Sequence, residues 1–291
     1  YTERRILWFL DWVMDKWRVD PGRVTVTSKH HRAGGGGPGG DGSGCSGAFH
    51  LAFRHPELFN SVIAKGPDVD YGSGPKTTMM AIWGKPEYKL KTADGANVYE
   101  VHDLPAVVKA WPAGTDMPLS TYIGRELDDE TGDLMAECLD RGGWVATFFS
   151  QWPTAHFLPV SATATWPSPM IRLNVRKDRV LPTFSRSAAA KFRDAPPRRP
   201  VFNLGYRFDG DLIVDKPDRV EVTIWRSGRH AQENADVTLS RIQKLKVSPG
   251  KTYAWKLGDH SGEAKADKHG LITIPGCPIP SSPTKLVVTP K

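Results

Sequence analysis

The stretch AGGGGPGGDGSGCSGAFHLAFRHPELF, residues 33–59, decides how the first half of the chain is interpreted. A glycine-rich run leads into a segment with the apolar spacing of a helix, which ends at Arg54-His55-Pro56. Such a run is found in phosphate-binding loops, in linkers, and in modified forms of the tight strand-to-helix turn that exposes a catalytic serine. The surrounding sequence helps to choose among these three features.

Nucleotide and metal binding are both disfavoured for the glycine run. Gly34, Gly36 and Gly39 match the spacing G-x-G-x-x-G, but a dinucleotide-binding turn needs the strand to enter the glycines directly. Here the run starts several residues after the preceding strand and ends well before the helix, and no Gly-Lys-Ser/Thr follows it. The adjacent His30 and His31 point apart in an extended segment and have no obvious third ligand, so we expect no metal site.

Outward from this stretch, predicted strands alternate with predicted helices. Apolar residues at helical spacing predict helices over residues 2–17, 46–59 and 129–143. Apolar and β-branched runs predict strands over residues 23–28, 61–66, 117–124 and 144–151. Strands that alternate with helices are typical of right-handed crossovers and a parallel sheet.

The pattern changes at SATATWPSP, residues 161–169. Beyond it, short strand-like segments such as RVEVTIW, KTYAWKL and KLVVTP are separated by Gly, Pro, Asn or Asp turns. This spacing is typical of an antiparallel β-sandwich. The sequence therefore predicts two domains, residues 1–163 and 164–291. The expected fold class is α/β, with a parallel sheet and flanking helices followed by a small antiparallel sandwich.

Composition excludes several classes of protein. The chain has 291 residues and a net charge of +7, of which residues 1–163 contribute −4 and residues 164–291 contribute +11. The positive residues are scattered among strands, with no recognition helix or stacking motif, so we expect no nucleic-acid partner. No apolar run is long enough to span a bilayer. Cys45, Cys138 and Cys277 are too few and too far apart for a disulfide framework or a zinc site.

Three candidate polar groups each follow a predicted strand. Serines lie in the glycine-rich turn, acidic residues follow in YIGRELDDETGD (122–133), and a histidine follows in FFSQWPTAHFLP (148–159). Nucleophile, acid, then histidine is the chain order of α/β-hydrolases. A serine hydroxyl becomes a good nucleophile when a histidine takes its proton, and a carboxylate holds that imidazole in the correct tautomer.

These motifs resemble a known family. WVMDKWRVDPGRVTVT, SGAFHLAFRHPELFNSVIA, GRELDDETGD and TAHFLP are similar to the later half of esterase and prolyl-oligopeptidase-like α/β-hydrolases. IVDKPDRVEVTIW resembles a β-domain that follows such enzymes in some bacterial proteins. The resemblance implies a partial α/β-hydrolase sheet, Asp128 as the triad acid with Asp129 as the neighbouring alternative, and His156 as the base. It implies no metal or organic cofactor, and a secreted or periplasmic location.

Two serines compete for the nucleophile position. Ser46 lies in GCSGA, whose small flanking residues suit a crowded turn, and the backbone N–H of Gly47 would then help to form the oxyanion hole. Ser43, with the N–H of Gly44, fits better the distance to the end of the helix. In the related hydrolases the distance from the nucleophile to the end of the helix corresponds to Gly42 here, one residue before Ser43. We prefer Ser46 and keep Ser43 as the alternative.

The expected function is cleavage of a carboxylic ester, small or polymeric, through an acyl-enzyme. The alternative is a catalytically inactive protein with a hydrolase fold that serves as a binding or scaffold module. It is suggested by Gly42, which occupies the position where the related hydrolases carry the nucleophilic serine. No early strands of a hydrolase sheet are found in residues 1–163, so either the hydrolase is truncated or an N-terminal part outside this sequence completes the sheet. In the truncated form the segment RVTVTS would be an exposed edge strand, so we expect a tendency to homodimerise through it.

Overall fold

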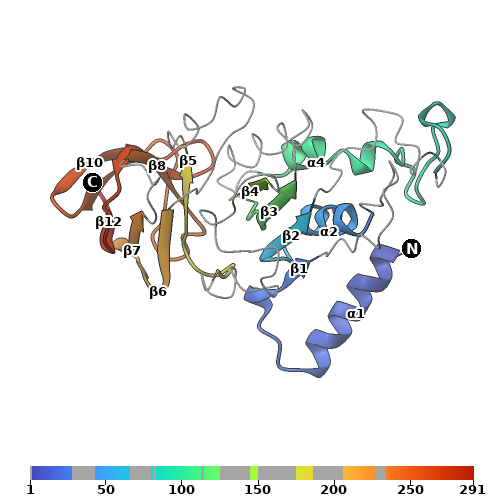
Figure 1. Ribbon diagram of the computed structural model, residues 1–291, viewed down its shortest axis with the longest axis horizontal. Coiled ribbons are helices and arrows are strands. Elements are labelled where there is room, and N and C mark those ends of the chain that lie inside the picture. The colour runs from blue at the N-terminus through green and yellow to red at the C-terminus, as the bar shows by residue number, and fades with distance from the viewer. Residues whose placement is uncertain are drawn as a thin grey trace.

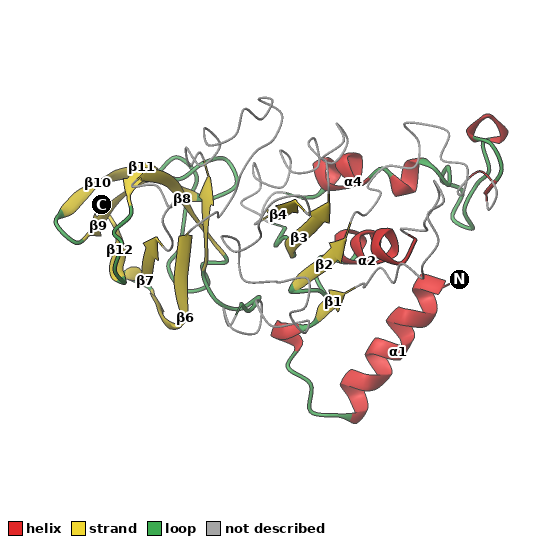
Figure 2. Cartoon of the chain, in the orientation of Figure 1, coloured by secondary structure: helices red, strands yellow, loops and turns green. Residues whose placement is uncertain are grey.

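The structure is a computed structural model, shown in Figure 1. It describes residues 2–27, 43–65, 80, 83–112, 115–124, 145–149, 175–185, 206–226 and 234–291. Within these residues the chain forms three α-helices and twelve strands in three sheets. Figure 2 shows the α-helices on the side of β1–β4, and strands joined by loops on the side of β5–β12.

The first sheet has four parallel strands in chain order. They are β1 (Thr25–Thr27), β2 (Ser61–Lys65), β3 (Leu119–Gly124) and β4 (Val145–Phe149). Each lies within a segment predicted to be a strand. The carboxyl ends of parallel strands meet at one edge of a sheet, so the segments that follow β1, β3 and β4 all begin at the same edge.

Helices α1 (Thr2–Lys16), α2 (Ser43–Arg54) and α4 (Leu104–Ala110) accompany this sheet. Helix α2 buries Phe49, Ala52 and Phe53, which repeat at the three- and four-residue spacing of one helix face. The ring of Phe53 stacks on Phe49, with centroids 5.3 Å apart, and on Trp111 at 5.9 Å. The aromatic rings thus join α2 to the end of α4, and the same buried cluster includes Val62 of β2.

The remaining strands form two antiparallel sheets that share one hydrophobic core. The five-stranded sheet has the order β10 (His260–Lys265), β9 (Thr252–Leu257), β12 (Thr284–Pro290), β7 (Arg219–Arg226) and β6 (Tyr206–Lys216). The three-stranded sheet has the order β11 (Ile272–Pro278), β8 (Asn234–Ser240) and β5 (Leu181–Ser185). Val237 and Leu239, two residues apart on β8, are both buried in the shared core.

The expected fold class, α/β with a partial hydrolase sheet, is wrong for this chain. Eight of the twelve described strands belong to antiparallel sheets, and only three α-helices accompany them in the described residues. The strands that alternate with helices before residue 163 account for one four-stranded sheet. Strands that pair antiparallel beyond residue 175 form most of the regular structure. The domain boundary at 163/164 and the helix over 129–143 lie outside the described residues and stay predictions.

Strand β1 is an edge of the parallel sheet among the strands described, and it has three residues. Short edge strands offer few backbone groups to a second chain. Dimerisation through β1 stays a prediction. No helix in the described stretches is long and apolar enough to cross a membrane.

Cys277 lies in the core of the antiparallel sheets, where burial raises the pKa of its thiol to about 12. Because the thiolate is the reactive form, we expect Cys277 to resist alkylation in the folded protein and to react once the chain unfolds. Iodoacetamide labelling at pH 8 with and without denaturant, read by mass mapping of the Cys277 peptide, measures this. Labelling of the native protein at the rate of an exposed thiol would contradict the burial.

Arg241, directly after β8, joins the antiparallel sheets to the parallel part. Its side chain is 1% exposed, and its Nε donates to Asp116 Oδ1 at 2.7 Å. The Nη1 atom donates to Asn60 Oδ1 (2.8 Å), and Nη2 donates to the carbonyls of Met117 (2.7 Å) and Asn60 (3.1 Å). The Arg241 backbone has a φ of 57°, a strained conformation for a residue with a Cβ. The guanidinium thus closes a buried network between distant parts of the sequence.

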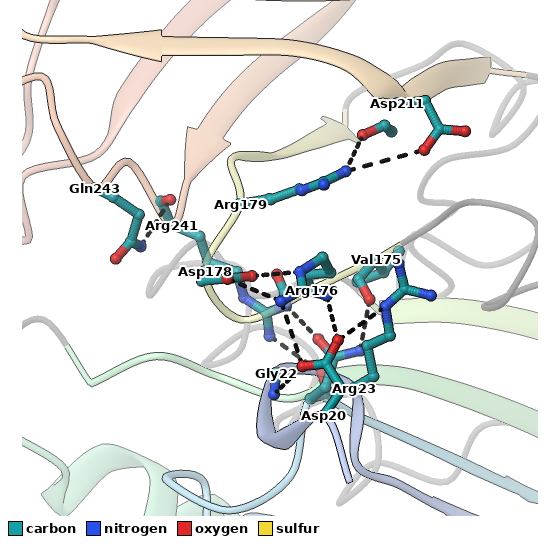
Figure 3. Close-up of polar contacts among 12 residues, drawn as sticks. Asp20, Gly22, Arg23, Val175, Arg176, Asp178, Arg179, Asp211, Arg241 and Gln243 are labelled. Atoms are coloured by element: carbon teal, nitrogen blue, oxygen red, sulfur yellow. Dashed lines mark hydrogen bonds and ion pairs between the residues drawn. The ribbon is translucent and has the colours of Figure 1, made fainter. Parts of the chain in front are cut away.

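A second polar cluster strengthens the same junction (Figure 3). Arg176 pairs with Asp20 and donates from Nε to Asp178 Oδ1 at 2.6 Å, and these hydrogen bonds raise its pKa above the ordinary value. Asp20 also accepts from the N–H of Gly22 at 3.0 Å, and the Lys177 N–H donates to the Gly22 carbonyl at 3.0 Å. The turn before β1 is therefore tied to the segment that leads into β5.

Candidate functional site

A cavity of about 980 Å³ lies beside the carboxyl end of β1. Its walls come from the first turns of α1, from the last residues of β1, from α2 and from the segment between residues 83 and 102. Val26 and Thr27 contribute from β1, and Gly47 and Ala48 contribute from α2. The cavity therefore lies on the side of the parallel sheet where the strands have their carboxyl ends, which is also where the candidate catalytic segments begin.

The structure places both candidate nucleophiles on α2. Ser43 is the first residue of that helix, and Ser46 lies one turn further along it. Gly47 borders the cavity, and a Cβ added at this glycine would meet no atom within 4 Å. Space around Gly47 is thus available to a ligand.

The other candidate triad residues lie outside the described residues. Strand β3 ends at Gly124, ahead of Asp128 and Asp129, and β4 ends at Phe149, ahead of His156. The parallel registers bring the ends of β3 and β4 to the edge where β1 also ends. The sheet thus gathers the starting points of the segments that carry the acid and the base.

A pair of histidines in the cavity wall was missed by the sequence analysis. The Nδ1 atoms of His50 on α2 and His102 lie 3.4 Å apart, and Trp83 stacks on the His102 ring with centroids 4.6 Å apart. The two histidines are 52 residues apart in the sequence, and no spacing rule connects them. Among the described residues, no group of three or more His, Cys, Asp or Glu is placed to hold a metal ion.

Burial lowers the pKa of His102 to about 4, with a smaller contribution from the positive charge of Arg54. The unfolded chain takes up this proton near pH 6.5, whereas the folded chain takes it up only near pH 4, so folding stability falls as pH falls through this window. Between pH 7 and pH 4.5 we expect the free energy of unfolding to fall by a value on the order of 2 kcal/mol. Partial exposure of the ring keeps this value below that of a fully buried histidine.

Urea unfolding at pH 7 and pH 4.5 measures this loss. His102→Phe keeps the ring stacked on Trp83 but cannot titrate, so its stability should change less between the two pH values than that of the wild type. His260→Gln, at an exposed position, is the matched control and should behave as the wild type does. Equal pH dependence in wild type and His102→Phe would contradict the assignment.

Glu3 ties α1 to the end of α2 beside the cavity. Its Oε2 accepts from Arg54 Nη1 at 2.9 Å, and its Oε1 lies 2.6 Å from His55 Nε2. These contacts explain the Arg54-His55 pair at the end of the helix: it serves to attach α1.

A second cavity, of about 400 Å³, lies at the junction around Arg241. Lys177 and Asp116 line it too, with Lys177 Nζ 3.6 Å from Asp116 Oδ2. Burial lowers the pKa of Lys177. Since these charged groups already bind one another across the junction, this cavity is a structural feature of that junction.

No known protein family, curated protein or solved structure matches this chain. The resemblance to α/β-hydrolases therefore rests on the motifs alone.

Proposed function

We propose that the chain is a serine hydrolase that cleaves carboxylic esters through an acyl-enzyme. Asp128, with Asp129 as the alternative, orients His156, which takes the proton of the serine. The proposal rests mainly on one observation. Strands β1–β4 are parallel, so the three candidate segments begin at the same side of the sheet, where the strands have their carboxyl ends and a cavity adjoins α2.

The start of α2 favours Ser43 over Ser46 as the nucleophile. The serine of a nucleophile elbow lies at the start of the helix, and α2 begins at Ser43; fifteen residues separate it from the end of β1, more than a tight elbow has. The first four N–H groups of a helix have no partner within it, so the Gly44 N–H is available to a developing oxyanion. The helical pattern directs the Gly47 N–H to the Ser43 carbonyl, which makes Gly47 a poorer donor to substrate.

The proposed reaction has two balanced halves. The serine Oγ attacks the ester carbonyl carbon while His156 accepts the hydroxyl proton, and the oxyanion forms beside the helix N-terminus. Collapse of this intermediate breaks the carbon–oxygen bond of the ester, and His156 returns the proton to the leaving alcohol. Water then attacks the acyl-enzyme in the same manner and releases the acid.

Labelling with a fluorophosphonate probe, followed by mass spectrometry to locate the adduct, tests this proposal. We expect an adduct on Ser43 or Ser46 that disappears in His156→Ala. Ser282→Ala, in an exposed loop, is the matched control and should label as the wild type does. Folded protein that takes no adduct at either serine would favour the inactive binding or scaffold protein instead.

A further inference from the structure

Helix α1 presents a large aromatic surface on the side that faces away from the protein. Glu3, Leu7 and Leu10 are among the residues through which it contacts the rest of the chain, and no residue of the helix is buried. On the outer side, Trp8 is 67% exposed and Trp12 is 39% exposed. Figure 1 shows α1 at the periphery of the molecule. A surface helix that is apolar on its outer side as well as its inner side is typical of a binding surface for another molecule.

We propose that the outer stripe of α1, formed by Arg5, Trp8, Trp12 and Asp15, binds the same stripe of a second copy of this chain in antiparallel orientation. The spacing within the stripe is three, four and three residues, which keeps the four side chains along one seam of a helix. About 100° of rotation per residue sets this seam nearly opposite the inner contacts at Glu3, Leu7 and Leu10. The stripe and the inner contacts can therefore be occupied together.

The order of residues along the stripe is self-complementary. A two-fold axis at the level of Leu10 places Arg5 opposite Asp15 of the second copy and Trp8 opposite Trp12 of the second copy. Antiparallel pairing thus joins opposite charges at both ends and stacks indole rings in the middle, whereas parallel pairing would set Arg5 against Arg5 and Asp15 against Asp15. Both charged residues already interact within the chain: Arg5 has such an interaction, and Asp15 pairs with Lys16 at 3.0 Å in an exposed position, a weak contact that is readily exchanged.

Charge also favours a protein partner over a lipid surface. Helices that lie on anionic membranes carry an excess of Lys and Arg. Helix α1 has three acidic and three basic residues, with Asp11 and Asp15 on its exposed side. A pair of helices of this length, about 22 Å, buries less area than most stable dimers, so the association is weak and depends on concentration.

Sedimentation velocity of the full chain, from about 1 to about 100 μM, tests the proposal across the range of weak dimers. We expect the wild type to dimerise, and Arg5→Asp or Asp15→Arg alone to weaken the dimer at least tenfold. The double variant Arg5→Asp/Asp15→Arg restores the opposite charges and should return the affinity to near that of the wild type. Lys244→Asp, an equal charge change at an exposed position remote from α1 in the sequence, should have no effect. Circular dichroism checks that each variant is folded.

Several outcomes would overturn the proposal. If the wild-type protein stays monomeric across the tested concentrations, the proposed dimer does not form. A dimer that neither single variant weakens lies on another surface, such as the β1 edge. Weakening in both single variants without recovery in the double variant excludes the antiparallel pairing. Binding of a monomeric wild type to vesicles of phosphatidylserine and phosphatidylcholine would assign the stripe to a membrane surface.

Discussion

Arg241→Met is expected to lower the free energy of unfolding by about 3 kcal/mol, because it leaves a network at the junction without its central donor. The guanidinium donates to Asp116, to the Asn60 side chain and to three backbone carbonyls, and its own side chain is 1% exposed. Methionine keeps the volume and the strained backbone of a non-glycine residue, so the change reports the lost hydrogen bonds. Urea unfolding monitored by tryptophan fluorescence measures the difference.

Arg179→Met is the matched control for this change. Arg179 is 39% exposed, donates to the Gly210 carbonyl at 3.0 Å and lies 3.9 Å from Asp211, so its loss should cost less than about 1 kcal/mol. Calorimetry adds a second readout: if Arg241 couples the two parts of the chain, its removal should split one unfolding transition into two. A loss below about 1 kcal/mol with one sharp transition would show that the junction does not depend on Arg241.

The second large effect concerns the proposed catalysis. Substitution by alanine of His156, or of the serine that takes the fluorophosphonate adduct, is expected to lower kcat/KM for a short-chain p-nitrophenyl ester by roughly ten-thousand-fold or more. The serine and the histidine act as a unit, so the double variant should be little slower than either single variant. Ser282→Ala should hydrolyse the ester as the wild type does.

Two results would argue against this mechanism. Additive losses in the double variant would mean that the two residues act independently. A loss of less than about tenfold in the single variants would place the measured turnover elsewhere on the chain or in a contaminant.

Helices α1 and α2 and strands β1–β4 were predictable because their signals are local, whereas the seven-residue helix α4 was not predicted. The spacing of Phe49, Ala52 and Phe53 predicts a helix, and α2 buries these residues. The segments RVTVTS and SVIAKG predict strands, and they pair in parallel as β1 and β2. The start of α2 was less predictable, because the serines and glycines ahead of Phe49 have no apolar period to mark it.

The sequence by itself predicted α1, α2 and β1–β4 at or near their observed positions, and it contains the order of residues along the α1 stripe, since both depend on spacings of a few residues. Only the tertiary structure decided that antiparallel sheets dominate the fold, that His102 meets His50, and that Arg241 reaches Asn60 across 181 residues. The physical reason is range. Backbone propensity and amphipathic period act over one or two turns, whereas a buried guanidinium or imidazole is placed by whichever elements the whole core brings together.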